Sequence, residues 1–272
     1  MTRHREIRTR VSAALGVIAC LAVTSSAQNT QPFDQSFSTY RDVLARFVRD
    51  GQVDYAALSA GRSALDRTAK AVGRVAQADE MLWPRGERMA FWINAYNLFT
   101  LRSIVDHYPI RSSLLTLSPR NSIRQIDGVW TTRHWAAAGR SVTLDQIEHD
   151  ILRPTFKDPR IHFAINCASK SCPSLRSEPY VGRDIEAQLD EATRRFLASS
   201  QGVRVSQGRL LVSSLFKWYA DDFAVGDRGL KGDAAIRAFV ERYGPPAAVV
   251  AAHASAPVRF LPYDWSLNDI DR

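Results

Sequence analysis

The stretch Glu87–His107, ERMAFWINAYNLFTLRSIVDH, decides the fold of this chain. Large apolar residues surround its helical axis on nearly all sides, and Pro109 ends it. A helix that is apolar all round lies inside a protein, whereas a surface helix carries one apolar stripe. The sequence therefore predicts a central, buried helix over residues 87–107, against which the other elements pack.

Two amide side chains interrupt this apolar helix. Asn94 and Asn97 lie three residues apart and therefore share one face. A buried amide needs hydrogen-bond partners. We expect this face to meet polar groups, and both asparagines are candidate site residues.

The segments around this helix alternate between helical and extended patterns. Helices are expected at residues 33–50, 56–76, 144–153, 185–198, 215–223, 234–243 and 246–253. Strands are expected at 160–166 and 258–261, and in hairpins within 129–142 and 203–212. Because the strands come mostly in hairpins and not in βαβ units, the fold class is α+β. We expect a single domain with a buried central helix, surrounding helices and a small, mainly antiparallel sheet.

The first residues are typical of an export signal. RHREIRTR is basic, VSAALGVIACLAV is apolar, and Ser25–Ala27 offers small residues before a cleavage site. A lipoprotein signal, with lipid attached at Cys20, is the alternative. No later stretch is apolar enough to span a bilayer. We expect a signal peptide over 1–27, a linker and helix over 28–52, the main domain over 53–269, and a periplasmic or secreted location.

The charge of the chain gives few clues to a partner. The net charge is +8, of which the segment through Ala27 carries +3, leaving +5 for the remainder. The basic residues are scattered and do not interleave with aromatic residues, so nucleic-acid binding is not expected. Glycine-rich nucleotide motifs are absent, and no cofactor is predicted. Cell-envelope peptides or polymers are the partners we expect.

The segment Arg160–Pro173, RIHFAINCASKSCP, concentrates the reactive residues. After removal or lipidation of Cys20, Cys167 and Cys172 are the cysteines left to the folded domain. In the strand predicted at 160–166, His162 points away from the face on which Cys167 would lie. A pairing of His162 with Cys167 therefore requires the chain to turn after Asn166.

Three interpretations of the two cysteines stay open. Export favours a structural Cys167–Cys172 disulfide. A nucleophilic thiol at Cys167 is the second interpretation, because a thiolate near a base attacks carbonyl carbon. Its helpers would be His162 or His149 as base, Lys170 and loop amides beside the thiol, and Asn94, Asn97 or Asp264 as orienting groups. A metal site of His162 and both cysteines is the third, and we predict no metal because a fourth ligand is lacking.

Other patterns carry less chemistry. Glu148, His149 and Asp150 lie on one helix, where adjacent residues point in different directions, so a partly exposed face is expected. Ser214 and Lys217 match Ser-x-x-Lys, but the companion motifs of serine acyl enzymes are missing. Phe216, Trp218 and Tyr219 are expected in the core, and Asp264 in a turn.

Several ordered blocks of the sequence resemble a known family. They are AFWINAYNLFTL (90–101), LDQIEHDILRP (144–154), DPRIHFAINCASKSCPSL (158–175), LFKWYADDF (215–223) and FLPYDWSLND (260–269). Together they resemble the bacterial, secreted branch of the domain of unknown function 547 family, over residues 53–269. The resemblance implies no established activity. It directs attention to the residues within these blocks, including Glu148, His149, Asn166 and Lys217 besides those named above.

The sequence leaves two functions open, and whether the protein is an enzyme stays undecided. The leading hypothesis is an exported domain with a thiol-centred site, a hydrolase or acyltransferase that acts on envelope peptides or amides. A papain- or transglutaminase-like layout would suit this chemistry, although this chain has no cysteine at the start of its buried helix. The alternative is a non-catalytic envelope domain that binds a ligand or partner, with its loop fixed by a Cys167–Cys172 disulfide.

Overall fold

The computed structural model describes residues 32–111, 118–224 and 229–270. Residues Phe33–Arg272 form one compact unit. The expected signal peptide, including Cys20, lies outside the described residues. The helix of the expected 28–52 segment packs in the same core as the central helix.

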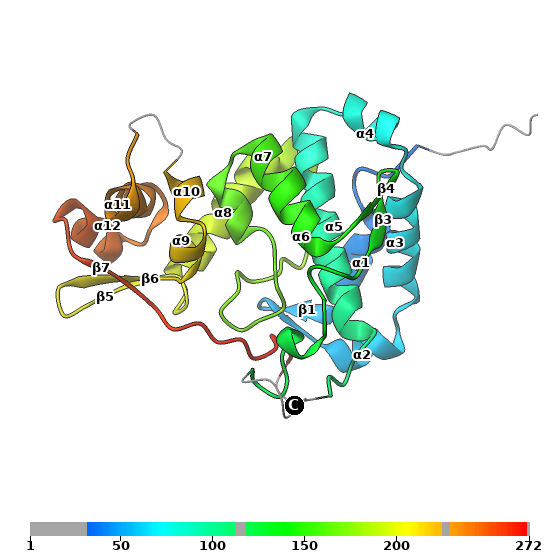
Figure 1. The fold of residues 1–272 in the computed structure, drawn as a ribbon, viewed down its shortest axis with the longest axis horizontal. Helices are drawn as coiled ribbons and strands as arrows, with labels where there is room; N and C mark the ends of the chain where they lie inside the picture. The colour runs from blue at the N-terminus through cyan, green and yellow to red at the C-terminus, as the bar shows by residue number, and fades with distance from the viewer. Residues whose placement is uncertain (1–31, 112–117, 225–228, 271–272) are drawn as a thin grey trace, which may run out of the picture. The chain divides into compact units, whose positions relative to one another are not determined.

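The central helix, α5 (Arg85–Val105), has every residue from Met89 to Leu101 buried. This confirms the prediction of a helix surrounded by protein on all sides. Figure 1 shows helices of the first part of the chain around α5. They are α1 (Ser38–Phe47), α2 (Tyr55–Ala60), α3 (Ser63–Arg74) and α4 (Gln77–Leu82).

The described strands pair in three small sheets. β1 (Val48–Arg49) pairs with β2 (Gln52–Val53), and β3 (Trp135–Ala137) with β4 (Arg140–Val142). The third sheet contains β5 (Val203–Ser206), β6 (Arg209–Val212) and β7 (Val258–Phe260). The pairings are antiparallel except for β6 with β7. The α+β class with mainly antiparallel strands is confirmed.

A second group of helices follows the reactive segment and has its own hydrophobic cluster, which includes Phe163, Phe216 and Val240. Its helices are α9 (Leu215–Trp218), α10 (Ala220–Phe223), α11 (Gly232–Tyr243) and α12 (Pro246–His253). α8 (Ile185–Ala198) joins the two clusters, with Ile185 and Leu189 in the core of the central helix and Phe196 and Leu197 in the second cluster, and η4 (Gly182–Asp184) contacts α5. After β7 the chain returns to the first group (Figure 1). There the Val53 amide donates to the Asn268 carbonyl at 2.9 Å. This return places residues 263–265 near the reactive segment.

Along the described chain, four short helices lie between α5 and the reactive segment. They are η1 (Ile123–Gln125), α6 (Leu144–Gln146), the π-helix η2 (Ile147–Leu152) and α7 (Arg153–Phe156). Thr143 and Gln146 form a capping box at the start of α6. A π-helix is wound more widely than an α-helix and is often found at functional sites.

The strand predicted at 160–166 is wrong. Residues Pro159–Phe163 form a 3-10 helix, η3. The Asp158 carboxylate caps its first turn by accepting a hydrogen bond from the backbone N–H of Arg160 at 3.0 Å. Proline is favoured in the first turn of a helix. Ile161, His162 and Phe163 are all buried, so the apolar alternation did not separate two faces of a strand.

Candidate functional site

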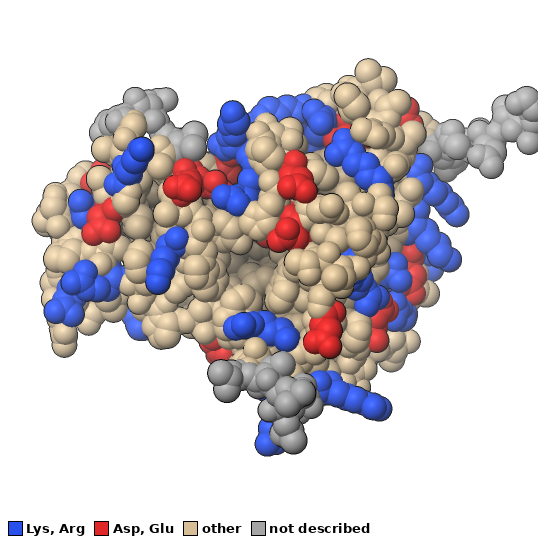
Figure 2. All heavy atoms as spheres, viewed as in Figure 1, with Lys and Arg blue, Asp and Glu red and all other residues tan. Residues whose placement is uncertain are grey.

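A cavity of about 400 Å³ lies between four parts of the chain: the reactive segment, η2, α9 and the residues that follow β7. Figure 2 shows a hollow with mostly uncharged walls in the centre of the same view. Cys167 and Cys172 line the cavity together with His149, His162 and Glu148. This volume lies within the range of small-molecule sites in proteins.

Two buried amides shape the loop that carries the cysteines. The backbone N–H of Asn166 donates to the side-chain Oδ1 of Asn97 at 2.8 Å, and Nδ2 of Asn97 donates to the Ala164 carbonyl at 3.0 Å. Asn166 in turn accepts from the Ala168 amide at 2.8 Å and donates to the Pro173 carbonyl at 2.7 Å. The chain turns at Ala168, which has a left-handed φ of 59°. The turn required after Asn166 is therefore present, and it brings Cys167 into the cavity.

Polar groups surround the sulfur of Cys167. Sγ lies 2.7 Å from Sγ of Cys172, 3.2 Å from the Ser169 hydroxyl and 3.2 Å from the Tyr263 hydroxyl. Hydrogen bonds from Cys172, then from Ser169 and Tyr263, lower the pKa of Cys167 against the opposing effect of burial. Lys170, expected beside the thiol, is exposed and does not line the cavity.

Cys172 is a second free thiol, and the predicted disulfide is not present in this structure. The Sγ–Sγ separation of 2.7 Å is longer than an S–S bond of about 2.05 Å. The Cys167 amide donates to Sγ of Cys172 at 2.8 Å. Burial, and the hydrogen bond to Cys167, raise the pKa of Cys172 well above its usual range. The two thiols thus differ in acidity: their surroundings lower the pKa of Cys167 and raise that of Cys172.

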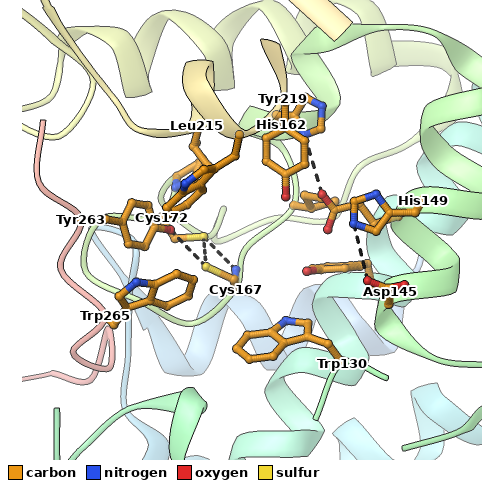
Figure 3. Close-up of a pocket in the computed structure, with 15 residues that line it drawn as sticks. Trp130, Asp145, His149, His162, Cys167, Cys172, Leu215, Tyr219, Tyr263 and Trp265 are labelled. Atoms are coloured by element: carbon orange, nitrogen blue, oxygen red, sulfur yellow. Dashed lines mark hydrogen bonds and ion pairs between the residues drawn. The ribbon is translucent and has the colours of Figure 1, made fainter. Parts of the chain in front are cut away.

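His162 lies in the same cavity and has different partners. Its Nε2 is 2.6 Å from Oδ2 of Asp222, and its ring stacks on Tyr219 with centroids 3.7 Å apart. Its Nδ1 has no hydrogen-bond partner and lies 3.8 Å from Oε1 of Glu148, which also has none. The hydrogen bonds of Cys167 go to Cys172, Ser169 and Tyr263. His162 and Cys167 therefore face one cavity without forming a hydrogen-bonded dyad (Figure 3).

Asp222 links His162 to a second histidine. Arg153 donates to both carboxylate oxygens of Asp222, at 2.6 and 2.9 Å, and its third nitrogen lies 2.6 Å from Nδ1 of His149. Burial alone would raise the pKa of Asp222, but hydrogen bonds from His162 and Arg153 hold it well below its usual range. His149 also lies 3.5 Å from Oδ1 of Asp145. The groups that orient both histidines are thus Asp222, Arg153 and Asp145.

The residues expected to orient the base lie elsewhere. Asn94 holds the backbone of Tyr180, donating to its carbonyl at 2.7 Å and accepting from its amide at 2.9 Å. Asp264 is exposed and accepts from the Ser266 amide at 2.8 Å, which is the expected turn chemistry. Asn97 lies on α5 and bonds the backbone of the cysteine loop. The two asparagines thus confirm the prediction that their helix face meets polar groups. None of the three lines the cavity.

Two expectations about α9 and η2 need correction. Trp218 and Tyr219 line the cavity, and Trp218 is 45% exposed, so it is not the core residue that we expected; Phe216 is buried as predicted. Glu148 is only 5% exposed and lines the cavity together with His149, so the partly exposed face is wrong for Glu148.

The Ser-x-x-Lys match has no catalytic geometry. Lys217 is exposed, and the Ser214 hydroxyl donates to the Leu261 carbonyl at 2.7 Å. Within the described ranges, no group of three or more His, Cys, Asp or Glu side chains is arranged to hold a metal ion. No helix in the described part of the chain is long and apolar enough to cross a membrane.

Sequence reasoning missed Asp222 and the aromatic wall of the cavity. Two of the sequence blocks that resemble the family contain these residues. LFKWYADDF includes Trp218, Tyr219 and Asp222, and FLPYDWSLND includes Tyr263 and Trp265, so the blocks could have directed attention to them. Tyr96, between the two asparagines of the central helix, lines the cavity as well.

The comparisons with known proteins give one family. Residues 81–197 match the family described as "Protein of unknown function, DUF547". The matched residues include the central helix, η2 and the cysteine loop. No curated protein and no solved structure matches the chain.

Proposed function

We propose that this protein is a thiol-dependent acyl-transfer enzyme, a hydrolase or acyltransferase, with Cys167 as its nucleophile. One observation carries the proposal: Sγ of Cys167 faces a cavity while three hydrogen-bonding groups favour its thiolate. A thiolate is the nucleophilic form of cysteine, so a lowered pKa increases the fraction able to attack at neutral pH.

The histidine across the cavity supports this chemistry. A carboxylate only accepts hydrogen bonds, so the proton on Nε2 of His162 points to Asp222 and leaves Nδ1 without a hydrogen-bond partner, 3.8 Å from Oε1 of Glu148. In the proposed reaction the Cys167 thiolate attacks a carbonyl carbon and a thioester forms. The proton that Cys167 gave up when its thiolate formed resides on Nδ1 of His162, and it passes to the leaving group as that group departs. An incoming water or acceptor returns a proton to Nδ1 as it attacks the thioester carbon, and the Cys167 thiolate is released. This division differs from a Cys–His dyad, since the cysteine is activated within its own loop.

The envelope setting belongs to the same proposal. Export by the first 27 residues, with cleavage or lipidation at Cys20, would place the enzyme in the periplasm or outside the cell. Peptides or amides of envelope polymers would then be its substrates. The alternative function is a binding domain without turnover, which the aromatic cavity wall would also serve.

Turnover assays separate these functions. Hydrolysis of activated aryl esters and peptide anilides would be measured with the wild type, Cys167→Ser and Cys172→Ser. We expect Cys167→Ser to abolish turnover and Cys172→Ser to retain a measurable part of it. Equal turnover by the wild type and Cys167→Ser would overturn the proposal. A complete lack of turnover and of thiol reactivity would favour the binding domain.

A further inference from the structure

The wall of the cavity differs in charge from the chain as a whole. The chain carries a net charge of +8, yet the residues lining this cavity include Asp145 and Glu148 and neither lysine nor arginine. Two arginines lie over rings of the wall without lining the cavity: Arg153 is paired with Asp222 and lies over the Tyr219 ring at 5.3 Å, and Arg124 lies over the Trp265 ring at 5.0 Å. The two histidines of the wall are held by Asp222 and Asp145. The cavity is therefore suited to a cation and not to an anion.

Aromatic rings form much of the same wall. Figure 3 shows Trp130, Trp265, Tyr263 and Tyr219 around the cavity. The faces of aromatic rings attract cations, and cages of such rings bind ammonium groups. The full aromatic set is Tyr96, Trp130, Trp218, Tyr219, Tyr263 and Trp265.

Glu148 supplies an acceptor without a partner at one side of the cavity. Its Oε1 is buried and accepts no hydrogen bond, and Nδ1 of His162, which is also unpartnered, lies 3.8 Å from it. A buried polar atom without a partner costs free energy, which a bound donor recovers. A primary ammonium has both the charge and the N–H donors to satisfy this oxygen, whereas a quaternary ammonium has only the charge.

We propose that the cavity binds a primary alkylammonium group, such as the side-chain or terminal amine of a peptide. The aromatic rings surround the cation, Glu148 accepts its hydrogen bond, and Asp145, which is 48% exposed by its side chain, attracts it at the mouth. The inference names the substrate class of the acyl-transfer site and rests on that proposed function for its catalytic consequence. The binding itself needs no thiol.

Fluorescence titration of the full chain tests this inference, because three tryptophans line the cavity. The probes are propylammonium, tetramethylammonium, butanol as a neutral counterpart, and glucose. We expect propylammonium to bind most tightly and tetramethylammonium more weakly. Stronger binding of butanol or glucose would overturn the inference in favour of an apolar or carbohydrate site, and so would a failure of all four probes to bind.

Variants locate the binding within the cavity. Glu148→Gln should weaken propylammonium binding about tenfold, because a hydrogen bond to a charged group is lost. Asp150→Asn is the matched control, since Asp150 lies on the same helix, is exposed and does not line the cavity. If Glu148→Gln does not fold, Asp145→Asn at the exposed mouth should still weaken binding measurably. Unchanged affinity in a folded Glu148→Gln, or in Asp145→Asn where that variant stands in, would contradict the proposal.

A Cys167→Ser variant separates this inference from the proposed function. It should bind propylammonium as the wild type does, while losing any turnover. Binding without turnover in the wild type would leave the ammonium site standing and remove the acyl-transfer function. Turnover without ammonium binding would support the acyl-transfer function and remove the ammonium site.

Discussion

Nε2 of His162 lies 2.6 Å from Oδ2 of Asp222, a residue 60 positions further along the chain. The contact joins η3 to α10, and Arg153 completes it by donating to both oxygens of the same carboxylate. This relationship holds the imidazole in one orientation and leaves its other nitrogen on the side of Glu148. The cavity thus depends on a carboxylate that does not itself line it.

Asp222→Asn should destabilise the protein by about 1–3 kcal/mol at pH 7, since two charge-assisted contacts are weakened. The pKa of Asp222 is lowered by folding, so its stabilising contribution is fully present above its unfolded pKa of about 3.9, begins to decline below that pH, and is lost as the pH falls through the lower folded pKa. The difference between variant and wild type should therefore shrink toward pH 3. Urea unfolding at both pH values measures it.

The adjacent Asp221 provides the control, because it is exposed and next in the chain. Asp221→Asn should unfold as the wild type does at both pH values. A loss of stability in Asp222→Asn that is the same at pH 3 and pH 7 would show that the ion pairs are not its cause.

Asn97→Ala should lower the free energy of unfolding by about 2–4 kcal/mol, since the Asn166 amide and the Ala164 carbonyl both lose a buried partner. The loop should also loosen, which makes Cys172 more reactive toward an alkylating reagent in the native protein. Thermal unfolding and native-state labelling measure the two effects. Wild-type stability in this variant would mean that α5 does not position the loop.

Mild oxidation should join Cys167 to Cys172, because the two sulfur atoms are in contact and the pKa of Cys167 is lowered. With diamide as oxidant, we expect an intact mass lower by two hydrogen atoms, reversed by a thiol reductant. Cys172→Ser should not show this loss and should instead form mixed adducts at Cys167. Two independently modified cysteines in the wild type would argue against the contact.

Tyr263→Phe should raise the pKa of Cys167, because it removes a hydroxyl that lies 3.2 Å from the sulfur. Fewer thiolates at pH 7 should slow alkylation of Cys167 about tenfold. The rate profile with pH is followed by peptide mapping. Tyr40→Phe is the control, since its hydroxyl is buried, has no hydrogen-bond partner and does not line the cavity. Identical pH profiles for Tyr263→Phe and the wild type would remove Tyr263 from the account.

The sequence predicted the local elements well where one face of a helix is apolar. The expected bounds 185–198 are those of α8, because periodicity defines such a helix without help from distant contacts. The expected bounds 246–253 are those of α12, which has no single apolar face and begins at Pro246. The expected helix 215–223 divides at Tyr219, whose backbone leaves the helical region. This break helps turn the aromatic side chain toward His162, and a periodic pattern cannot report it.

The candidate site was predictable as a place and not as an arrangement. The loop with Cys167 and Cys172 and the histidines His149 and His162 were found from residue type and spacing. Asp222 was not, because its role depends on a contact between segments far apart in sequence. The strand error at 160–166 had a local cause: the Asp158–Pro159 start favours a helical turn, and complete burial hid the difference between the two periods.

The most direct test of the central claim is the intact mass of the protein after brief exposure to an activated acyl ester, followed by acid quenching and peptide mapping. We expect a single acyl group on Cys167, absent from Cys167→Ser and retained in Cys172→Ser. An acyl group that forms equally in Cys167→Ser, or that maps to Cys172, would contradict the assignment of Cys167 as the nucleophile.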